Sequence, residues 1–310
     1  MLIKAADDRQ PDVDVLTALM ARPGVDGATR RHIEEELRRI QAGARGEREA
    51  SYEIEFHFGA NPNRMTIHDL RLEVDGRVAQ IDHLMIDRLL GIWVCESKQF
   101  SEGVAVDEFG EWTGFHNRRP FGIGSPIEQN RKHIAVLGDV FAKRLVDLPT
   151  RLGVAIKPAF HSLILVSKQA RITRPKSKAG RARVDDLDSV IKVDQLNTLM
   201  DKYWNSRGIA DFRRIVGKGE IERIARQLVA LHRPIAVDWR SRFGLPQEFS
   251  IAPEPAVPAA VAPATAAAVC QLCSKRVSQA VVAFCRERAE LFGNRILCMD
   301  CQRKARRGQI

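Results

Sequence analysis

The feature that most constrains the fold of this chain is a mostly apolar segment, residues 80–98, with the sequence QIDHLMIDRLLGIWVCESK. Two apolar runs, residues 81–86 and 92–95, flank the short connection DRLLG. This pattern is typical of a β-hairpin whose strands are buried on both faces. Asp82, Glu96 and Lys98 interrupt the apolar pattern, so the fold must place three ionisable side chains on a buried hairpin.

The spacing brings these three side chains together. A hairpin that turns near residues 89–90 pairs positions whose numbers add up to about 179, so Asp82 is expected across from residues 96–98. Glu96 and Lys98 share a face because side chains alternate along a strand. Two partly buried carboxylates repel each other, and a divalent cation is the usual means of keeping both ionised. Lys98 would position water or stabilise charge on a phosphoryl group, the alternative being a buried ion pair with one acid.

The spacing Asp-x13-Glu-x-Lys resembles the core of the PD-(D/E)xK nuclease superfamily. The chain resembles more specifically the nuclease-related domain (NERD) family over about residues 44–145. Two departures are the serine in the middle of the E-x-K triplet, where threonine is expected, and Gln99-Phe100, where a polar asparagine often follows. The motifs that carry the resemblance are Gly46-Glu47, Gln80-Ile81-Asp82-His83, Glu96-Ser97-Lys98, and Pro126 with Gln129 and His133.

The resemblance implies a restriction-endonuclease-like α/β sandwich, with a mixed central sheet flanked by helices. It implies a nuclease that hydrolyses phosphodiesters of nucleic acid, with DNA expected, and that uses Mg²⁺ or Mn²⁺ bound by Asp82 and Glu96. Glu47 would bind the metal through water or act as an orienting base, and Gln129 would bind the attacking water or a phosphate oxygen. For Glu47 the structural alternative is that the helix dipole alone favours a glutamate near a helix start.

Hydrophobic periodicity predicts the other elements of this domain. Residues 29–57 are expected to form two helices with a break near Gly43 and Gly46. Residues 116–124 are expected to be a loop, with Arg118 and Arg119 solvated rather than bound to phosphate. The remaining predicted strands are residues 65–74, 103–106, 111–115, 160–167 and 190–193, and the remaining predicted helices are residues 126–145, 194–204 and 219–232.

Three further side chains of this domain have a structural interpretation. His133 is expected to be a partly exposed helix residue. His83 alternates away from Asp82 and is expected to support the sheet or the adjoining helix. Cys95 lies inside an apolar strand and is expected in the core.

Residues 168–183 carry seven Lys or Arg in sixteen positions and are expected to form a mobile basic loop. The whole chain has a net charge of +10, which favours a polyanionic partner. The candidate nucleic-acid contacts are Lys176, Lys178, Arg181 and Arg183, and a merely solvated loop is the alternative.

Two cysteine pairs near the end of the chain, Cys270-x2-Cys273 and Cys298-x2-Cys301, have the spacing of zinc knuckles. Four thiolates satisfy tetrahedral Zn²⁺, and so small a module needs the metal to fold. Cys285 is expected to be a buried thiol or to replace one of the four. The predicted domains are an N-terminal helical segment (1–43), a nuclease-like domain (44–206), a helical extension (207–245), an Ala/Pro-rich linker (246–269) and a zinc ribbon (270–310).

The chain lacks an apolar run of about 18 residues and a signal-peptide pattern, so a cytoplasmic protein without membrane contact is expected. The leading function is a metal-dependent nuclease, a hydrolase whose zinc ribbon aids docking to nucleic acid or to a protein partner. One alternative is a catalytically silent nuclease-like fold that only binds nucleic acid or protein. Another is a regulatory protein whose fold is held together by metal.

Overall fold

The computed structural model describes residues 1–184, 186–208, 211, 215–245 and 268–306. The chain divides into two compact units, Met1–Asp7 with Ala42–Ile235 and Asp8–Gln41 with Ala236–Ile310. The predicted linker lies outside the described residues except for its last two positions.

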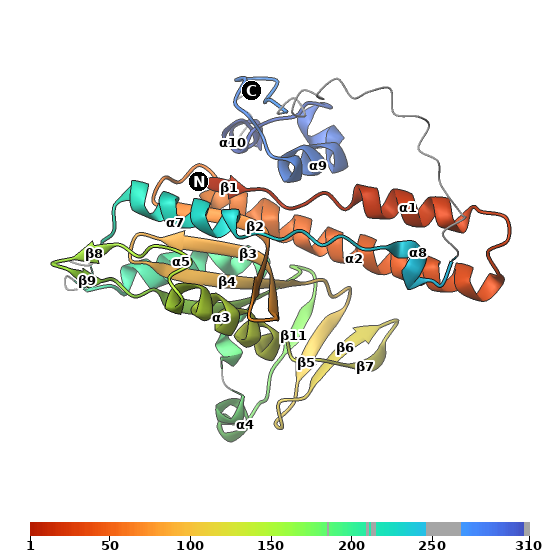
Figure 1. Ribbon diagram of the computed structural model, residues 1–310, viewed down its shortest axis with the longest axis horizontal. Helices are drawn as coiled ribbons and strands as arrows, with labels where there is room; N and C mark the ends of the chain where they lie inside the picture. Colours follow the sequence, from red (N-terminus) through yellow and green to blue (C-terminus); the bar gives the residue numbers. More distant parts are fainter. Residues whose placement is uncertain (185, 209–210, 212–214, 246–267, 307–310) are drawn as a thin grey trace. The chain divides into compact units, whose positions relative to one another are not determined.

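The first unit is built on a six-stranded sheet in the order β1-β2-β3-β4-β10-β12 (Figure 1). The predicted antiparallel meander consists of β2 (Arg64–Val74), β3 (Arg77–Asp87) and β4 (Gly91–Lys98). Parallel strands extend it on both sides: β10 (Ala159–Val166) pairs with β4, β12 (Val190–Lys192) with β10, and β1 (Leu2–Lys4) with β2. The mixed sheet confirms the predicted α/β class, although β1 was not predicted.

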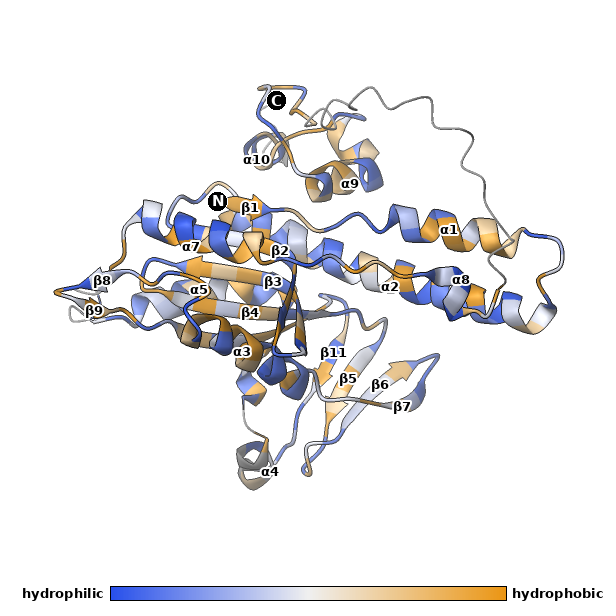
Figure 2. Cartoon of the chain, in the orientation of Figure 1, coloured by the Kyte–Doolittle hydropathy of each residue, from blue (hydrophilic) through white to orange (hydrophobic). Residues whose placement is uncertain are grey.

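Helices cover both faces of this sheet because neighbouring strand residues point in opposite directions. Ile92 and Val94 face the core under α3 (Pro126–Ala142) and α7 (Lys218–Ala230). Trp93 and Cys95 face the core under the last turns of α2 (Gly27–Phe58) and under α5 (Leu196–Asn205). Figure 2 shows orange and pale segments in the central strands and both orange and blue residues on the helices that cover them.

Helix α2 runs unbroken through Gly43 and Gly46, so the predicted helix break is wrong. A Cβ atom at position 46 would lie 2.9 Å from the Cβ atom of Gln99, just beyond β4. The glycine therefore serves the close approach of the helix to the chain that leaves β4, which a side chain would prevent.

A second sheet of the same unit has the order β11-β5-β6-β7. The sequence predicted β5 (Gly103–Val106) and β6 (Trp112–His116), but β7 (Arg119–Ile123) lies where a loop was expected. Asn117 and Arg118, with φ of 50° and 60°, form the two-residue turn between β6 and β7. The basic segment 168–183 is also not a continuous loop, because it contains β11 (Arg171–Thr173) and α4 (Lys178–Arg183).

Short elements complete the first unit. The strands β8 (Thr150–Arg151) and β9 (Val154–Ala155) pair as a small hairpin. Two 3₁₀ turns, η1 (Leu187–Ser189) and η2 (Val193–Gln195), flank β12, and the second leads into α5.

The second unit contains a helical part and the cysteine module. The helical part consists of α1 (Gln10–Met20), the start of α2 and α8 (Trp239–Arg242), which pack around Leu16, Leu19 and Ile33. The Nε1 atom of Trp239 donates a hydrogen bond to Asp12 at 2.8 Å. The cysteine module contains α9 (Gln279–Glu287), η3 (Ala289–Phe292) and α10 (Met299–Arg306). Among the described residues, no helix combines the length and hydrophobicity that a membrane span needs.

The turn between β3 and β4 depends on the fully buried Asp87. Its carboxylate accepts hydrogen bonds from the backbone N–H groups of Leu89 (2.8 Å) and Gly91 (3.1 Å) and from Trp93 Nε1 (3.0 Å). Asp87→Asn replaces an acceptor oxygen by a donor and should cost about 1–3 kcal/mol of unfolding free energy in urea titrations. Asp75→Asn, in the exposed β2–β3 turn, is the matched control and should change stability by less than about 0.5 kcal/mol. Equal losses would contradict this role of Asp87.

Candidate active site and cysteine cluster

The hairpin places Asp82 against the segment 96–98, as the spacing predicted. The ladder between β3 and β4 runs from Ile86–Ile92 to His83–Cys95 and ends there. Asp82 follows at the point where the ladder ends. Its Oδ2 atom accepts hydrogen bonds from the backbone N–H and the hydroxyl of Ser97, both at 2.8 Å.

Glu96 is the centre of the polar cluster, with a relative exposure of 2%. Its Oε1 atom accepts hydrogen bonds from Lys98 Nζ at 2.8 Å and from Gln129 Nε2 at 2.7 Å. Lys98 Nζ also donates to Gln129 Oε1 at 3.1 Å. Gln129 reaches β4 because α3 starts directly beside it: the Ser125 side chain accepts from the N–H of Glu128, and proline occupies the first turn.

The second oxygen of Glu96, Oε2, is buried without a hydrogen-bond partner among the described residues. The nearby Nδ1 atom of His133 lies 3.6 Å away and also has no such partner. His133 is 8% exposed, so the prediction of a partly exposed histidine is wrong. A buried carboxylate oxygen without a donor is costly and marks a position suited to a cation or a proton.

The electrostatics of the cluster favour a bound cation. Burial, and then the charge of Asp82, raise the pKa of Glu96 to about 7, although Lys98 opposes this shift. Burial also raises the pKa of Asp82 against the hydrogen bonds from Ser97. Burial, and then Lys98, lower the pKa of His133 to about 4, so its imidazole is neutral at pH 7. Two acids whose charged forms are disfavoured are the group that a divalent cation stabilises.

Glu47 belongs to the same region. It follows Gly46, whose contact with Gln99 brings α2 against the end of β4. Glu47 is half-buried, and its charge contributes to the raised pKa of Glu96. The structure therefore brings Glu47, Asp82, Glu96, Lys98 and Gln129 into one neighbourhood, while their roles stay predictions.

Asp69 of β2 was missed by the sequence reasoning. The pairs His68–His83 and Leu70–Ile81 place it beside Asp82 on the neighbouring strand. It is 6% exposed, has a φ of 50°, and its charge adds to the raised pKa of Asp82. A lone acid inside the apolar stretch MTIHDLRLEV is the signal that could have identified it.

His83 and Cys95, for which the sequence predicted structural roles, lie where they were predicted. His83 is buried, and its Nδ1 atom lies 2.9 Å from Nδ1 of His68, so it supports the sheet as predicted. Cys95 is fully buried in the core.

The basic segment places Lys176 and Arg181 on the surface. Arg181 Nε donates to the carbonyl oxygen of Pro175 at 2.9 Å. The side chains of Lys178 and Arg183 lie outside the described part of the chain. Contact of these four residues with nucleic acid stays a prediction.

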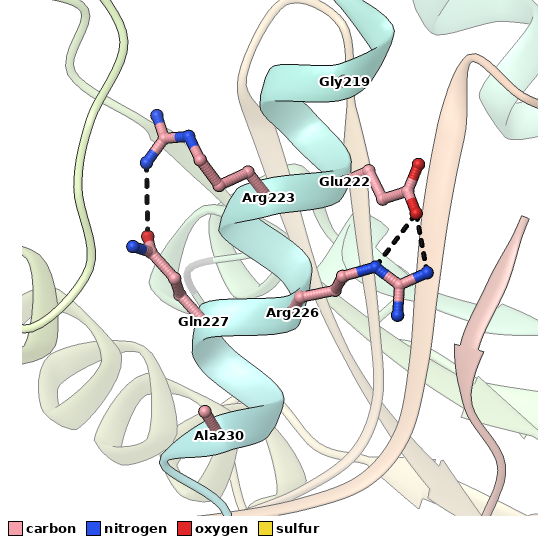
Figure 3. Close-up of a pocket in the computed structure, with 6 residues that line it drawn as sticks. All are labelled: Gly219, Glu222, Arg223, Arg226, Gln227 and Ala230. Carbon is pink, nitrogen blue, oxygen red and sulfur yellow. Dashed lines mark hydrogen bonds and ion pairs between the residues drawn. The ribbon is translucent and has the colours of Figure 1, made fainter.

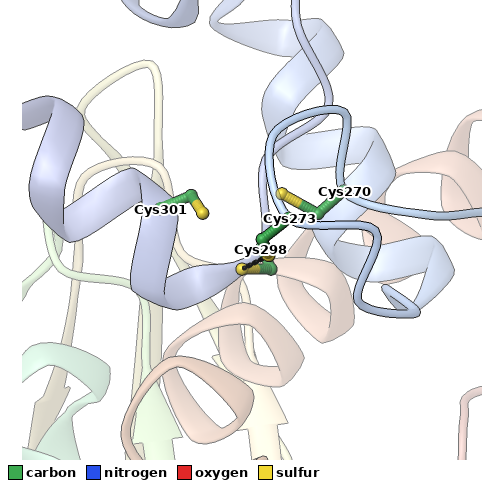
Figure 4. A group of neighbouring side chains, drawn as sticks. All are labelled: Cys270, Cys273, Cys298 and Cys301. Atoms are coloured by element: carbon green, nitrogen blue, oxygen red, sulfur yellow. Dashed lines mark hydrogen bonds between the residues drawn. The ribbon is translucent and has the colours of Figure 1, made fainter. Parts of the chain in front are cut away.

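The four predicted cysteines converge in the cysteine module (Figure 4). The Sγ atoms of Cys270, Cys273, Cys298 and Cys301 lie within 4.8 Å of one another, a geometry compatible with tetrahedral zinc. Burial opposes ionisation of the Cys270 thiol, but backbone N–H donors at Cys298, Leu272 and Cys273 outweigh it and lower its pKa to about 6.

Cys285 stands outside this cluster. It is buried, and its sulfur accepts hydrogen bonds from Leu297 N–H at 3.4 Å and from Gln302 Nε2 at 3.3 Å. The interpretation as a buried thiol is therefore confirmed.

A hollow on α7 has no comparable chemistry (Figure 3). Its lining comes from one helix, and Arg226 donates to Glu222 at 2.9 and 2.7 Å. Its lining residues, Gly219, Glu222, Arg223, Arg226, Gln227 and Ala230, include no buried polar atom without a partner.

Comparison with known families supports the resemblance inferred from the sequence. Residues 42–167 match the family model NERD, nuclease-related domain. This match includes all five residues of the candidate active site, and the cysteine cluster lies outside it. Comparisons with curated proteins and with solved structures gave no match.

In the metal-free protein, Glu96 should make stability depend on pH. Its pKa rises from 4.5 to about 7 on folding, so the folded state binds the proton more tightly. The resulting stabilisation is complete below about pH 4.5 and is lost as the pH rises to about 7. Between about pH 5 and about pH 8 the native protein should lose unfolding free energy on the order of 3 kcal/mol at most, and Glu96→Gln should abolish this loss. Urea unfolding at the two pH values measures both proteins. An identical pH dependence in both proteins would contradict the shifted pKa.

Proposed function

We propose that this protein, whose residues 42–167 match the nuclease-related domain family, is a metal-dependent nuclease that hydrolyses phosphodiester bonds, with DNA as the expected substrate. The observation that carries the proposal is the state of the Glu96 carboxylate. One oxygen is held by Lys98 and Gln129, and the other is buried without a partner among the described residues, close to His133. Simple ion pairing with Lys98 leaves that second oxygen unexplained.

The donor set fits Mg²⁺ or Mn²⁺, because hard cations prefer carboxylate oxygens. Asp82 and Glu96 would be the direct ligands, and Glu47 would act through water or as an orienting base. When bound, the cation would stabilise the negative charge that develops on the phosphoryl oxygens.

The chain's own side chains supply the positioning. Gln129 and Lys98 fix the Oε1 atom of Glu96 and leave Oε2, 3.6 Å from Nδ1 of His133, without a hydrogen-bond donor among the described residues. The Lys98 side chain is 30% exposed, so its ammonium can donate to an attacking water or to a phosphate oxygen while it stays bonded to Glu96. His133, neutral at pH 7, leaves the negative charge of Glu96 available.

The rest of the chain would contribute to binding. The net charge of +10 supports a polyanionic partner, and Lys176, Lys178, Arg181 and Arg183 are the proposed contacts in the basic segment. The four-cysteine cluster would hold one structural Zn²⁺ in a ribbon that docks nucleic acid or a protein partner. The proposed use of four cysteines as zinc ligands rather than in disulfides fits a reducing, cytoplasmic location.

Cleavage of labelled single- and double-stranded DNA and RNA, with Mg²⁺ or Mn²⁺, tests the nuclease. Asp82→Ala and Lys98→Ala should each reduce cleavage at least about 100-fold, because each removes a group that stabilises or positions the reacting phosphate. Lys143→Ala, at an exposed lysine that is ion-paired with Asp75, is the matched control and should cut normally. If the native protein binds nucleic acid but never cuts it, the silent binding module is the better description.

Metal analysis tests the zinc site. The native protein should contain about one zinc per chain, and the double variant Cys273→Ser with Cys301→Ser should lose it, because two thiolates cannot complete a tetrahedral site. Cys285→Ser is the matched control and should keep the metal. Zinc retained in the double variant would refute the assignment.

A further inference from the structure

We call the β11-β5-β6-β7 sheet the small sheet. At its end closest to Lys98 lie arginines from two segments that are far apart in the sequence. Arg171 pairs in register with Gly103, five residues after Lys98 in the chain. Glu102 joins the segments: its carboxylate accepts the N–H of Arg118 at 3.0 and 3.2 Å, and its carbonyl oxygen accepts the N–H of Arg171 at 3.0 Å. This end of the sheet therefore lies next to the chain that leaves the candidate active site (Figure 1).

We call Arg118, Arg119 and Arg171 the arginine edge. All three are exposed, and among the described residues their guanidinium groups make neither a hydrogen bond nor an ion pair. Arginines on the helices are different, since Arg131 donates to Glu128 and Arg226 to Glu222. The guanidinium groups of the arginine edge thus have no ion-pair partner among the described residues, although the carboxylate of Glu102 lies at the same end of the sheet.

An aromatic ring stands beside these cations. Phe121 is 47% exposed, so a large part of its ring is open to solvent. Phe121 pairs with Gly114, and Arg119 pairs with His116, so the ring and the Arg119 side chain share one face of the β6–β7 hairpin. A Cβ atom at Gly114 would lie 2.7 Å from the ring, so the ring rests on bare backbone and its other side is free to stack.

The opposite end of the same sheet lacks this combination. Phe109 in the β5–β6 turn is 82% exposed, but its neighbours in the chain include Asp107, Glu108 and Glu111. Phe109 thus stands among acids in the chain, whereas Phe121 shares its face of the hairpin with Arg119.

We infer that the arginine edge and Phe121 bind a single-stranded stretch of nucleic acid beside the scissile phosphodiester, with the arginines on phosphates and Phe121 stacked on an unpaired base. Cationic grooves with aromatic platforms are the usual means of binding single strands. In a duplex the faces of the bases are covered by their neighbours, so Phe121 has nothing to stack on. This inference rests on the proposed nuclease function for the cleavage step and narrows its substrate to nucleic acid with an unpaired segment.

Fluorescence anisotropy with labelled single-stranded and hairpin-duplex oligonucleotides tests the aromatic part, in an Asp82→Asn background to exclude cleavage. Phe121→Ala should weaken single-strand binding about tenfold, the effect of losing one base stack, and leave duplex binding unchanged. Phe121→Trp should restore single-strand binding, and Phe109→Ala should have no effect. Unchanged single-strand binding by Phe121→Ala, or equal losses with both oligonucleotides, would overturn the stacking role.

Salt titrations test the arginine edge. The triple variant Arg118→Gln, Arg119→Gln and Arg171→Gln should reduce the slope of log K against log salt for single strands by about 2, because each lost phosphate contact removes about 0.7. Arg223→Gln with Arg226→Gln on α7 is the control and should leave the slope unchanged. The inference would be overturned if the triple variant unfolds at the same temperature as the native protein and has the same slope of log K against log salt.

Cleavage assays on the Phe121 and arginine variants with Asp82 intact, beside the binding assays in the Asp82→Asn background, separate the two proposals. If the native protein cuts nucleic acid, and the variants of Phe121 and of the arginine edge bind and cut it equally well, the proposed binding surface is wrong and the nuclease function stands. A protein whose single-strand binding depends on Phe121 and the arginines, but which never cuts, would overturn the nuclease and support the surface.

Discussion

The burial of one carboxylate, that of Glu96, is the constraint on which the organisation of the domain depends. Glu96 ends an apolar strand that is paired on both sides and covered by α3, so its charge has little access to water. Such a group must be held by donors or by a cation. Lys98 and Gln129 satisfy one oxygen and leave the other facing His133. The cap of α3, the bond from Ser97 to Asp82 and the close approach at Gly46 all serve to bring polar groups to this point.

A short stretch of chain connects the candidate active site with the proposed binding surface. Three strands of the β11-β5-β6-β7 sheet, β5, β6 and β7, follow Lys98 and precede Gln129 in the chain, and β11 follows β10. The arginine edge of this sheet is anchored to Glu102, only four residues beyond Lys98. A nucleic acid strand bound there would be positioned relative to Glu96 by a short, hydrogen-bonded connection rather than by a separate domain. Positioning of this kind is a main source of rate in phosphoryl transfer.

Local signals misled where tertiary contacts decided the outcome. Gly43 and Gly46 lower helix propensity, yet α2 continues because its apolar face packs on the sheet and Gly46 permits contact with Gln99. The sequence of β7, RPFGI, contains Pro and Gly and shows no alternation, but pairing with β6 makes it an edge strand. His133 was predicted to be partly exposed and is buried because the first turns of α3 lie against β4.

The sequence by itself determined the hairpin, its approximate register, the convergence of Asp82 with the segment 96–98 and the two cysteine knuckles. These features depend on the spacing of residues within one element or one turn, which backbone geometry converts directly into proximity. Only the tertiary structure decided that Asp69, His133 and the arginine edge lie beside the candidate site. Each of these residues meets the candidate site through contacts with other helices and strands. Such contacts depend on how the elements pack and pair, and a local sequence pattern does not predict this packing.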